Sequence, residues 1–315
     1  MLTTTLEASE TSKSPVASPK KKRHYRATKA GYAFLSPWLL GFFVLTAGPM
    51  LASLILAFTD YHLLRNGIQF VGMDNFKRML TDPDFLASVK VTVTYVIFGT
   101  PIKLLSALGV AMLLNTKRRG QGIYRSALYV PSLIGASVSI AIVWKALFVD
   151  HGIIDQISQL FGADAGGWVG NPSRTMPMLI LLTVWQFGAP MVIFLAGLKQ
   201  IPGELYEAAE VDGAGPARKF FNITIPMLSP VLFFNLLLET INAFQIFASA
   251  FVISNGTGGP AKSTLFYTLY LYFRGFRDFE MGYASALAWV LMIVVGIIAL
   301  IYFRTSKIWV HYSGE

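Results

Sequence analysis

Four polar side chains recur within one apolar run of this sequence: Asn235, Glu239, Asn242 and Gln245. They are separated by four, three and three residues, which places them on one face of a helix. Together, a carboxylate and three amides can both accept and donate hydrogen bonds, which suits a ligand built of hydroxyl groups. Polar groups in apolar spans usually face a cavity or another helix. We therefore predict a solute pathway here, with hydrogen bonding between helices as the alternative.

The run WQFGAPM, which starts at Trp185, offers a second polar position in an apolar segment. Gln186 supplies an amide, while Gly188 and Pro190 interrupt the helix that the flanking residues predict. Broken helices of this kind occur beside binding sites in transporters, and a kink that serves packing alone is the alternative. Aromatic rings in these two segments could stack on the apolar faces of a sugar. They are Trp185, Phe244 and Phe247.

No other pattern predicts catalysis or a bound cofactor. The stretch GTGGPAKST has the glycines and the Lys-Ser pair of a phosphate-binding loop, but that loop requires a glycine where Ala261 stands. The four histidines lack metal-ligand spacing, and the chain has no cysteine. We therefore expect no metal or cofactor bound by this chain and no catalysis by the chain alone.

An acidic passage at residues 201–222 lies between two apolar runs. A proline and a glutamate favour the start of a helix there. Glu204, Glu207 and Glu210 recur every three residues and share one stripe of that helix, beside small side chains. Gly213 can end the helix, and a second short helix can follow. The pattern predicts a rigid helical unit, with a merely solvated loop as the alternative.

The elements that position these residues are membrane helices. Of the 315 residues, 54% are hydrophobic and 14% are charged, against about 25% charged in a soluble domain. A bilayer requires about 20 mostly apolar residues per helix, and backbone groups in lipid must be bonded internally. The sequence predicts an all-α membrane protein with six transmembrane helices. Their spans are residues 32–58, 89–114, 128–148, 176–198, 227–253 and 283–303.

The distribution of Lys and Arg predicts the orientation. These residues are concentrated in the N-terminal tail, in alternate loops and after the last span, which places both termini and the acidic passage in the cytoplasm. The composition predicts a largely disordered tail at residues 1–29, followed by a membrane domain at residues 30–315. The net charge of +9 lies beside membrane spans, so it favours lipid head groups and not nucleic acid. Lys103 and Lys145 are expected to extend from span ends to the interface, without a function.

The acidic passage resembles the cytoplasmic loop signature of permease subunits of binding-protein-dependent ABC importers. Matching positions are Glu207, Ala208, Ala209, Gly213, Ile223 and Pro226, with Asp212, Ala214 and Pro230 also fitting. The stretches FVGMDNFKRMLTDPDF, YRSALYVPSLI and SNGTGGP are similar to the carbohydrate (maltose/sugar-type) branch. The likeness extends from Gly31 to Trp309. The maltose-type subunit has extra N-terminal spans and a large external insertion, and this sequence shows neither.

This resemblance implies the type I ABC importer transmembrane fold in a prokaryotic cytoplasmic (inner) membrane. The implied partners are a second homologous permease, two ATP-binding subunits that use ATP and Mg, and an extracytoplasmic solute-binding protein. The acidic passage becomes the coupling helix docked on the ATPase, through Glu204, Glu207, Ala208, Ala209, Asp212 and Gly213. Alternating access would then import a sugar past polar residues of the fifth span.

Other functions stay open on the sequence. Glu239 is less typical of sugar permeases, and its carboxylate would also suit a cationic polyamine. A glycerol phosphodiester would require Lys or Arg in the pathway. An ion-coupled secondary transporter would show internal repeats and no docking loop. Asp74 or Asn75 is expected to cap a short helix that Pro83 ends.

Overall fold

The computed structural model describes residues 23–116, 120–134, 138–162 and 167–311. Within these ranges the regular structure is helical, apart from one isolated β-bridge between Thr59 and Phe70. The described chain divides into two units, one up to Ala52 and one from Ser53 onward. Most of the predicted tail, residues 1–22, lies outside the described residues.

The first unit consists of consecutive helical segments, the last of which continues past Ala52 into the second unit. Helix α1 (Arg23–Phe42) continues through a π-helical turn, η1 (Phe43–Ala47), into α2 (Gly48–Leu56). Pro49 has no N–H to donate within α2, and the wider turn before it accommodates the proline. The stretch Gly31–Leu56 has 26 residues and is apolar enough to cross a membrane.

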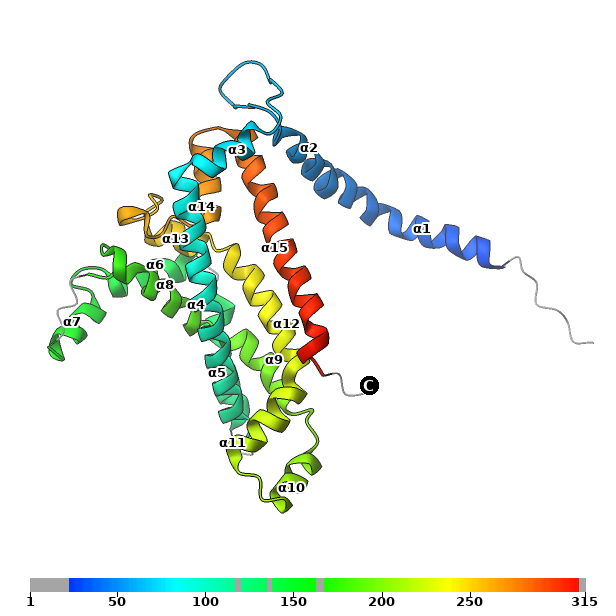
Figure 1. The fold of residues 1–315 in the computed structure, drawn as a ribbon, viewed down its shortest axis with the longest axis vertical. Coiled ribbons are helices and arrows are strands. Elements are labelled where there is room, and N and C mark those ends of the chain that lie inside the picture. The colour runs from blue at the N-terminus through cyan, green and yellow to red at the C-terminus, as the bar shows by residue number, and fades with distance from the viewer. Residues whose placement is uncertain (1–22, 117–119, 135–137, 163–166, 312–315) are drawn as a thin grey trace, which may run out of the picture. The chain divides into compact units, whose positions relative to one another are not determined.

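The second unit is a bundle of helices around α4 (Figure 1). Helix α4 packs against α8, α9, α12 and α14. The longer helices of this unit are α3 (Asp74–Thr81), α4 (Pro83–Leu114), α5 (Gln121–Ile134), α6 (Val138–Phe148), α7 (Ile153–Leu160), α8 (Pro172–Trp185), α9 (Gly188–Leu198), α10 (Gly203–Val211), α12 (Ile225–Phe244) and α15 (Met281–Trp309). Short segments are α11 (Pro216–Lys219), η2 (Phe220–Thr224), α13 (Ala248–Ile253), η3 (Pro260–Lys262), α14 (Tyr267–Tyr272) and η4 (Phe273–Arg277).

Four helical stretches of the described chain are each long and apolar enough to cross a membrane. They are Gly31–Leu56, Pro83–Leu114, Pro216–Ile253 and Met281–Trp309. Two bent pairs bring the number to six if each counts as one span: α5 with the stretch Val138–Leu160, which contains α6 and α7, inclined at 97°, and α8 with α9, inclined at 45°. The predicted third span is therefore two helices in place of one straight helix, with residues 135–137 outside the described part.

The short helix before α4 corrects one prediction. Helix α3 is capped by Met73 without a side-chain bond, so the expected cap by Asp74 or Asn75 is wrong. The Asn75 amide instead donates to the carbonyl oxygens of Ala57 and Thr59, at 2.9 and 2.8 Å. Asp82 accepts from the amides of Asp84 and Phe85, and Pro83 occupies the first turn of α4. Pro83 thus opens the second membrane helix, which starts six residues earlier than predicted.

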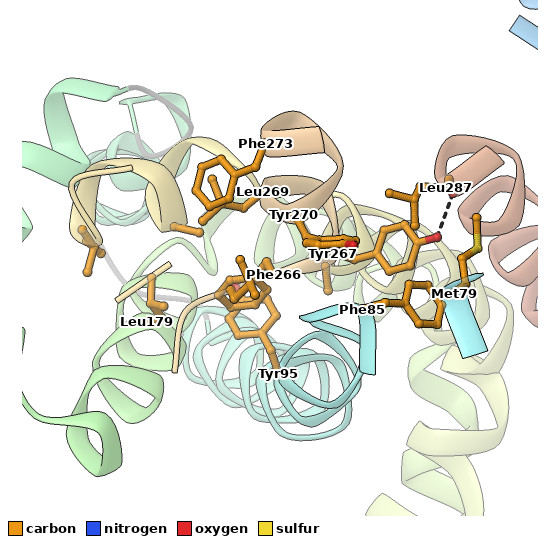
Figure 2. Close-up of a cluster of buried hydrophobic side chains, with 14 of the residues drawn as sticks. Met79, Phe85, Tyr95, Leu179, Phe266, Tyr267, Leu269, Tyr270, Phe273 and Leu287 are labelled. Atoms are coloured by element: carbon orange, nitrogen blue, oxygen red, sulfur yellow. Dashed lines mark hydrogen bonds between the residues drawn. The ribbon is translucent and has the colours of Figure 1, made fainter. Parts of the chain in front are cut away.

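Two apolar clusters hold this bundle together. The first joins α3, the N-terminal half of α4, α8, α14 and α15, and is rich in aromatic rings (Figure 2). Its buried Tyr267 donates to the carbonyl of Leu287 at 2.8 Å, which ties α14 to α15. The second joins Leu104–Ala111 of α4 with α9 and the first half of α12. The stretch of α4 between the two clusters borders the site described next.

Candidate functional site

A polar cavity of about 550 Å³ lies between the two apolar clusters of the second unit. Its walls come from the middle of α4, the end of α5, the break between α8 and α9, and the junction of α12 with α13. Cavities of roughly 300–1,000 Å³ hold small-molecule ligands in proteins. The lining residues are Tyr95, Thr100, Lys103, Ser132, Thr183, Gln186, Ala189, Glu239, Asn242, Ala243, Gln245, Ile246, Phe247, Ala248 and Ser249.

Four of the six residues predicted for the solute pathway line this cavity: Gln186, Glu239, Asn242 and Gln245. Gln186 and Gln245 occupy the C-cap positions of α8 and α12, where each helix breaks. Asn235 lies outside the lining, because it is 2% exposed and its amide donates to the Val231 carbonyl of its own helix at 3.1 Å. The cavity therefore combines two helix breaks with one polar face of α12.

Lys103 corrects the expectation that it reaches the membrane interface. It lies on the cavity wall, and its Nζ is 2.6 Å from Oε2 of Glu239, with both side chains 12% exposed. Lys145 donates to the Val252 carbonyl at 3.2 Å and to the side chain of Asn255, and its expected place at the interface stays a prediction. Glu239 is thus part of an ion pair between α4 and α12, and the pair adds no net charge to the cavity.

Two further groups complete the polar wall on the side of α4. The hydroxyls of Tyr95 and Thr183 are bonded to each other, which connects α4 to α8 at the cavity edge. Thr100 is 4% exposed, and its Oγ1 has no hydrogen-bond partner among the described residues. A buried hydroxyl without a partner is costly unless water or a ligand bonds it.

Gly188 serves packing at the helix break and does not line the cavity. A Cβ at this position would lie 2.7 Å from the Leu128 carbonyl oxygen and 2.8 Å from the Tyr129 Cα, both on the backbone of α5. The close approach lets the Ser132 hydroxyl donate to the Gln186 carbonyl at 2.9 Å and accept from the Ala189 amide at 3.0 Å. Ser132 thereby bonds two backbone groups at the helix break. This matters because backbone groups in an apolar environment must find hydrogen-bond partners within the protein.

The aromatic rings predicted beside the pathway have different surroundings. Phe247 lines the cavity and also packs against Phe251 and Tyr272. Trp185 packs against Trp144, with ring centroids 5.6 Å apart, and Phe244 borders a separate apolar pocket of about 200 Å³. Only Phe247 of the three can offer a ring to a solute in the polar cavity.

The acidic passage forms the helical unit that the sequence predicts. Helix α10 starts after Pro202 and ends at Val211, with Gly213 in the left-handed region at φ 74°. The Ala214 amide then donates to the Ala209 carbonyl at 2.8 Å, which closes the helix end. In the structure α10 lies at the end of the bundle away from α3 (Figure 1).

Helix α10 leaves much of its surface open. Glu204, Glu207, Ala208, Asp212 and Gly213 are exposed, and Ala209 is partly buried. The neighbouring apolar side chains of Leu205 and Val211 are 41% and 89% exposed, respectively. Acidic and apolar groups thus alternate around a short helix that protrudes from the bundle.

Two side-chain contacts brace α10 against the chain that follows it. Tyr206 and Thr224 share a hydrogen bond of 2.9 Å between their hydroxyls. Lys219 lies 2.6 Å from the Glu210 carboxylate, and this hydrogen bond with its positive charge holds the pKa of Glu210 below its ordinary value. After Lys219, η2 leads into α12, where Pro226 follows the π-helical turn. Residues 216–244 therefore form one continuous helical stretch from the acidic passage to the cavity.

The opposite end of the bundle carries a charged network around Asp82. Tyr270 donates to Asp82 Oδ2 at 2.5 Å, and Arg274 lies 3.3 Å from the same oxygen. Burial raises the pKa of Asp82, but the hydrogen bonds from Tyr270, Asp84 and Phe85 and the Arg274 charge outweigh it, so that the pKa is lowered. The network ties the start of α4 to α14 and η4.

Apolar helices of membrane-spanning length around a polar cavity, with a protruding helix at one end, define a membrane transport component. Residues 91–306 match the family of binding-protein-dependent transport system inner membrane components. The chain belongs to this family. It is therefore a multi-pass membrane permease subunit, as the resemblance of the acidic passage predicted.

Relatives along the whole chain agree with this family. The probable ABC transporter permease protein YesP of Bacillus subtilis (strain 168) is 50% identical over 299 residues, covering 94% of this chain and 96% of the relative. The lactose transport system permease protein LacF of Rhizobium radiobacter is 30% identical over 292 residues, covering 91% and 96%.

A solved structure has the same fold. It is the crystal structure of a bacterial alginate ABC transporter in complex with an alginate pentasaccharide-bound periplasmic protein. The TM-score is 0.75 at 21% identity, with 90% of this chain and 96% of the solved chain covered. The helical arrangement is thus the type I ABC permease fold that the resemblance implied.

Proposed function

We propose that this chain forms half of the membrane pathway of an ATP-driven importer for a neutral sugar or oligosaccharide in a prokaryotic cytoplasmic membrane. The single observation that carries the proposal is the cavity, whose charged groups are paired and whose remaining polar groups are amides and hydroxyls. Such groups bond the hydroxyls of a sugar without favouring an ion. A relative that transports lactose supports the same substrate class.

The energy comes from partner subunits in this proposal. The exposed face of α10, with Glu207 at its centre, docks on an ATP-hydrolysing subunit, two copies of which serve this chain and a second permease. A solute-binding protein delivers the sugar at the other end of the bundle. Closure of the ATPase pair moves the two α10 helices, and the cavity opens alternately to the two sides of the membrane.

The charge of the cavity decides among the rival solutes. A polyamine would require an unpaired carboxylate, but Lys103 lies against Glu239 at 2.6 Å. A glycerol phosphodiester would require an unpaired cation, and the same contact neutralises the charge of the ammonium group. The paired charges therefore favour a neutral solute over a polyamine and over a glycerol phosphodiester. Removing Lys103 or Glu239 would leave one unpaired charge, which would favour a charged solute instead.

The docking role of α10 is tested by Glu207→Ala in the complete transporter with its partner subunits. We expect uptake of labelled neutral sugars, such as lactose and larger neutral oligosaccharides, to be abolished, because the docking face loses its carboxylate. The amount of chain inserted in the membrane should not change, since the Glu207 side chain is exposed.

Gln200→Ala is the matched control, because it removes an exposed side chain of similar length just before α10. This variant should retain uptake. Full sugar uptake by Glu207→Ala would contradict the docking role. A wild-type transporter that takes up none of the neutral sugars would contradict the proposed substrate class.

A further inference from the structure

The α4 wall of the cavity has a role that the family signature does not specify. Thr100 and Lys103 are three residues apart on α4 and line the cavity on the same face of the helix. We propose that Lys103, together with Glu239, forms a subsite for a pair of neighbouring hydroxyls of a neutral sugar. This inference rests on the proposed function and assigns its specificity to Lys103.

Lys103 and Glu239 present a donor beside an acceptor. The ammonium group has three N–H donors, and Glu239 Oε2 takes one of them at 2.6 Å. The carboxylate retains Oε1 and further lone pairs. Two adjacent sugar hydroxyls match this arrangement, because one can accept from the ammonium group while the other donates to the carboxylate. Hydrogen bonds to charged groups are shorter and stronger than bonds between neutral groups. The ion pair can therefore replace the water molecules that hydrate the two sugar hydroxyls in solution.

Thr100 limits the subsite on the same wall. Its Oγ1 is buried within the bundle, and it has no hydrogen-bond partner among the residues that the structure describes. This hydroxyl is shielded from the cavity, so Lys103 and Glu239 carry the contacts to the sugar.

The pair also sets the charge of the subsite. With Lys103 present, the carboxylate is neutralised and the cavity gains no preference for cations or anions. The side chains are only 12% exposed, so removing one partner would leave a poorly solvated charge inside the bundle. Lys103 is therefore a specificity-determining residue that keeps the site selective for uncharged, hydroxyl-rich solutes.

A purely structural role for the pair predicts different behaviour. If Lys103 and Glu239 only linked α4 to α12, replacing both with apolar side chains of similar size would preserve function, because such replacements are often neutral or stabilising. Under our proposal the same double variant folds normally but loses the donor and the acceptor that hold the sugar.

The test uses the complete transporter reconstituted with its solute-binding protein, with labelled lactose and larger neutral oligosaccharides as probes. The double variant Lys103→Met/Glu239→Leu should keep the wild-type melting temperature and lower the uptake rate by about tenfold or more. Lys103→Arg keeps a charged donor and should retain most of the uptake. Lys145→Met is the matched control, since Lys145 bonds to α13 and its loop and lies outside the cavity lining.

The variants separate a binding role from a structural one. A double variant that transports at the wild-type rate would overturn the subsite, and so would a Lys103→Arg variant whose uptake is no higher than that of the double variant. If the wild-type transporter takes up no neutral sugar, the proposed function itself fails, which distinguishes the two failures.

Discussion

Replacing Gly188 by alanine tests how the cavity is built at the break between α8 and α9. The added Cβ would lie 2.7 Å from the Leu128 carbonyl oxygen and 2.8 Å from the Tyr129 Cα. The shorter of these distances is 0.7 Å below the 3.4 Å at which ordinary van der Waals contact begins. Both obstacles are backbone atoms, so α5 must move away from α9 as a unit and cannot relieve the clash by a rotamer change.

The size of the effect follows from two opposing terms. Overpacking of this kind costs about 1–3 kcal/mol, whereas alanine in place of glycine in a helix gains up to about 1 kcal/mol. We expect Gly188→Ala to lower the free energy of unfolding by about 1–2 kcal/mol. Gly109→Ala is the matched control, because Gly109 lies inside α4 with nothing within 4 Å of an added Cβ. The control should be neutral or slightly stabilising.

The assay is unfolding of the purified chain in detergent, followed by tryptophan fluorescence for both variants and the wild type. The displacement of α5 should also lengthen the bonds of Ser132 to Gln186 and Ala189, so uptake by the complete transporter should fall in Gly188→Ala alone. Equal unfolding free energies for Gly188→Ala and Gly109→Ala would refute the claim that backbone contact at this break requires glycine.

Two further predictions concern the ends of the bundle. Asp82→Asn should lower the melting temperature at pH 7. The pKa of Asp82 is lowered in the folded protein, so the stability that its carboxylate contributes is present above pH 3.8, its ordinary pKa, and is lost as the pH falls through the folded value. The melting temperatures of the variant and the wild type should therefore converge in acid. Differences that stay constant down to pH 3 would contradict this assignment. Lys219→Glu should reduce uptake by weakening the brace on α10, and adding Glu210→Lys should restore it. Failure of the exchanged pair to recover uptake would exclude the brace.

The sequence predicted the parts of the site that depend on local spacing. Glu239, Asn242 and Gln245 follow helical periodicity, so their common face could be read without knowing any neighbouring helix. The glycine and proline after Gln186 indicated the break between α8 and α9 in the same way. The end of α10 at Gly213 was also visible, because a glycine in the left-handed region is a local signal.

The role of Lys103 could not be predicted, because it depends on which helices are neighbours. No local pattern shows that α4 lies beside α12, and a lysine near the end of an apolar run is expected to extend to the interface. One signal was available but was used only in part. Asp82 followed by Pro83 was taken as the end of a helix, and α3 does end at Thr81, but the same pair also caps and opens α4. Lys103 lies 11 residues before the end of α4 at Leu114, well inside the span, so it requires a partner.

Asn235 shows that helical periodicity can also predict a cavity residue where there is none. It shares the predicted face with Glu239, yet it lies one turn further from the cavity and bonds within its own helix. The reason is that the second apolar cluster, built from α4, α9 and the first half of α12, closes the bundle at that level. Spacing places a side chain on a face, but the packing of neighbouring helices decides how far along that face a cavity extends.

The continuity of α12 connects the two ends of the proposed mechanism. Residues 216–244 form one continuous helical stretch, and Thr224, which is bonded to Tyr206 of α10, precedes Glu239 by about 22 Å at the helical rise of 1.5 Å per residue. In the proposed mechanism, a displacement of α10 would be transmitted along this stretch to Glu239. Lys103 belongs to α4, which is anchored to α14 and η4 through Asp82, so such a displacement would change the separation of the two charged groups. On this proposal, the ion pair is the point at which motion at α10 would alter the affinity of the cavity for its solute.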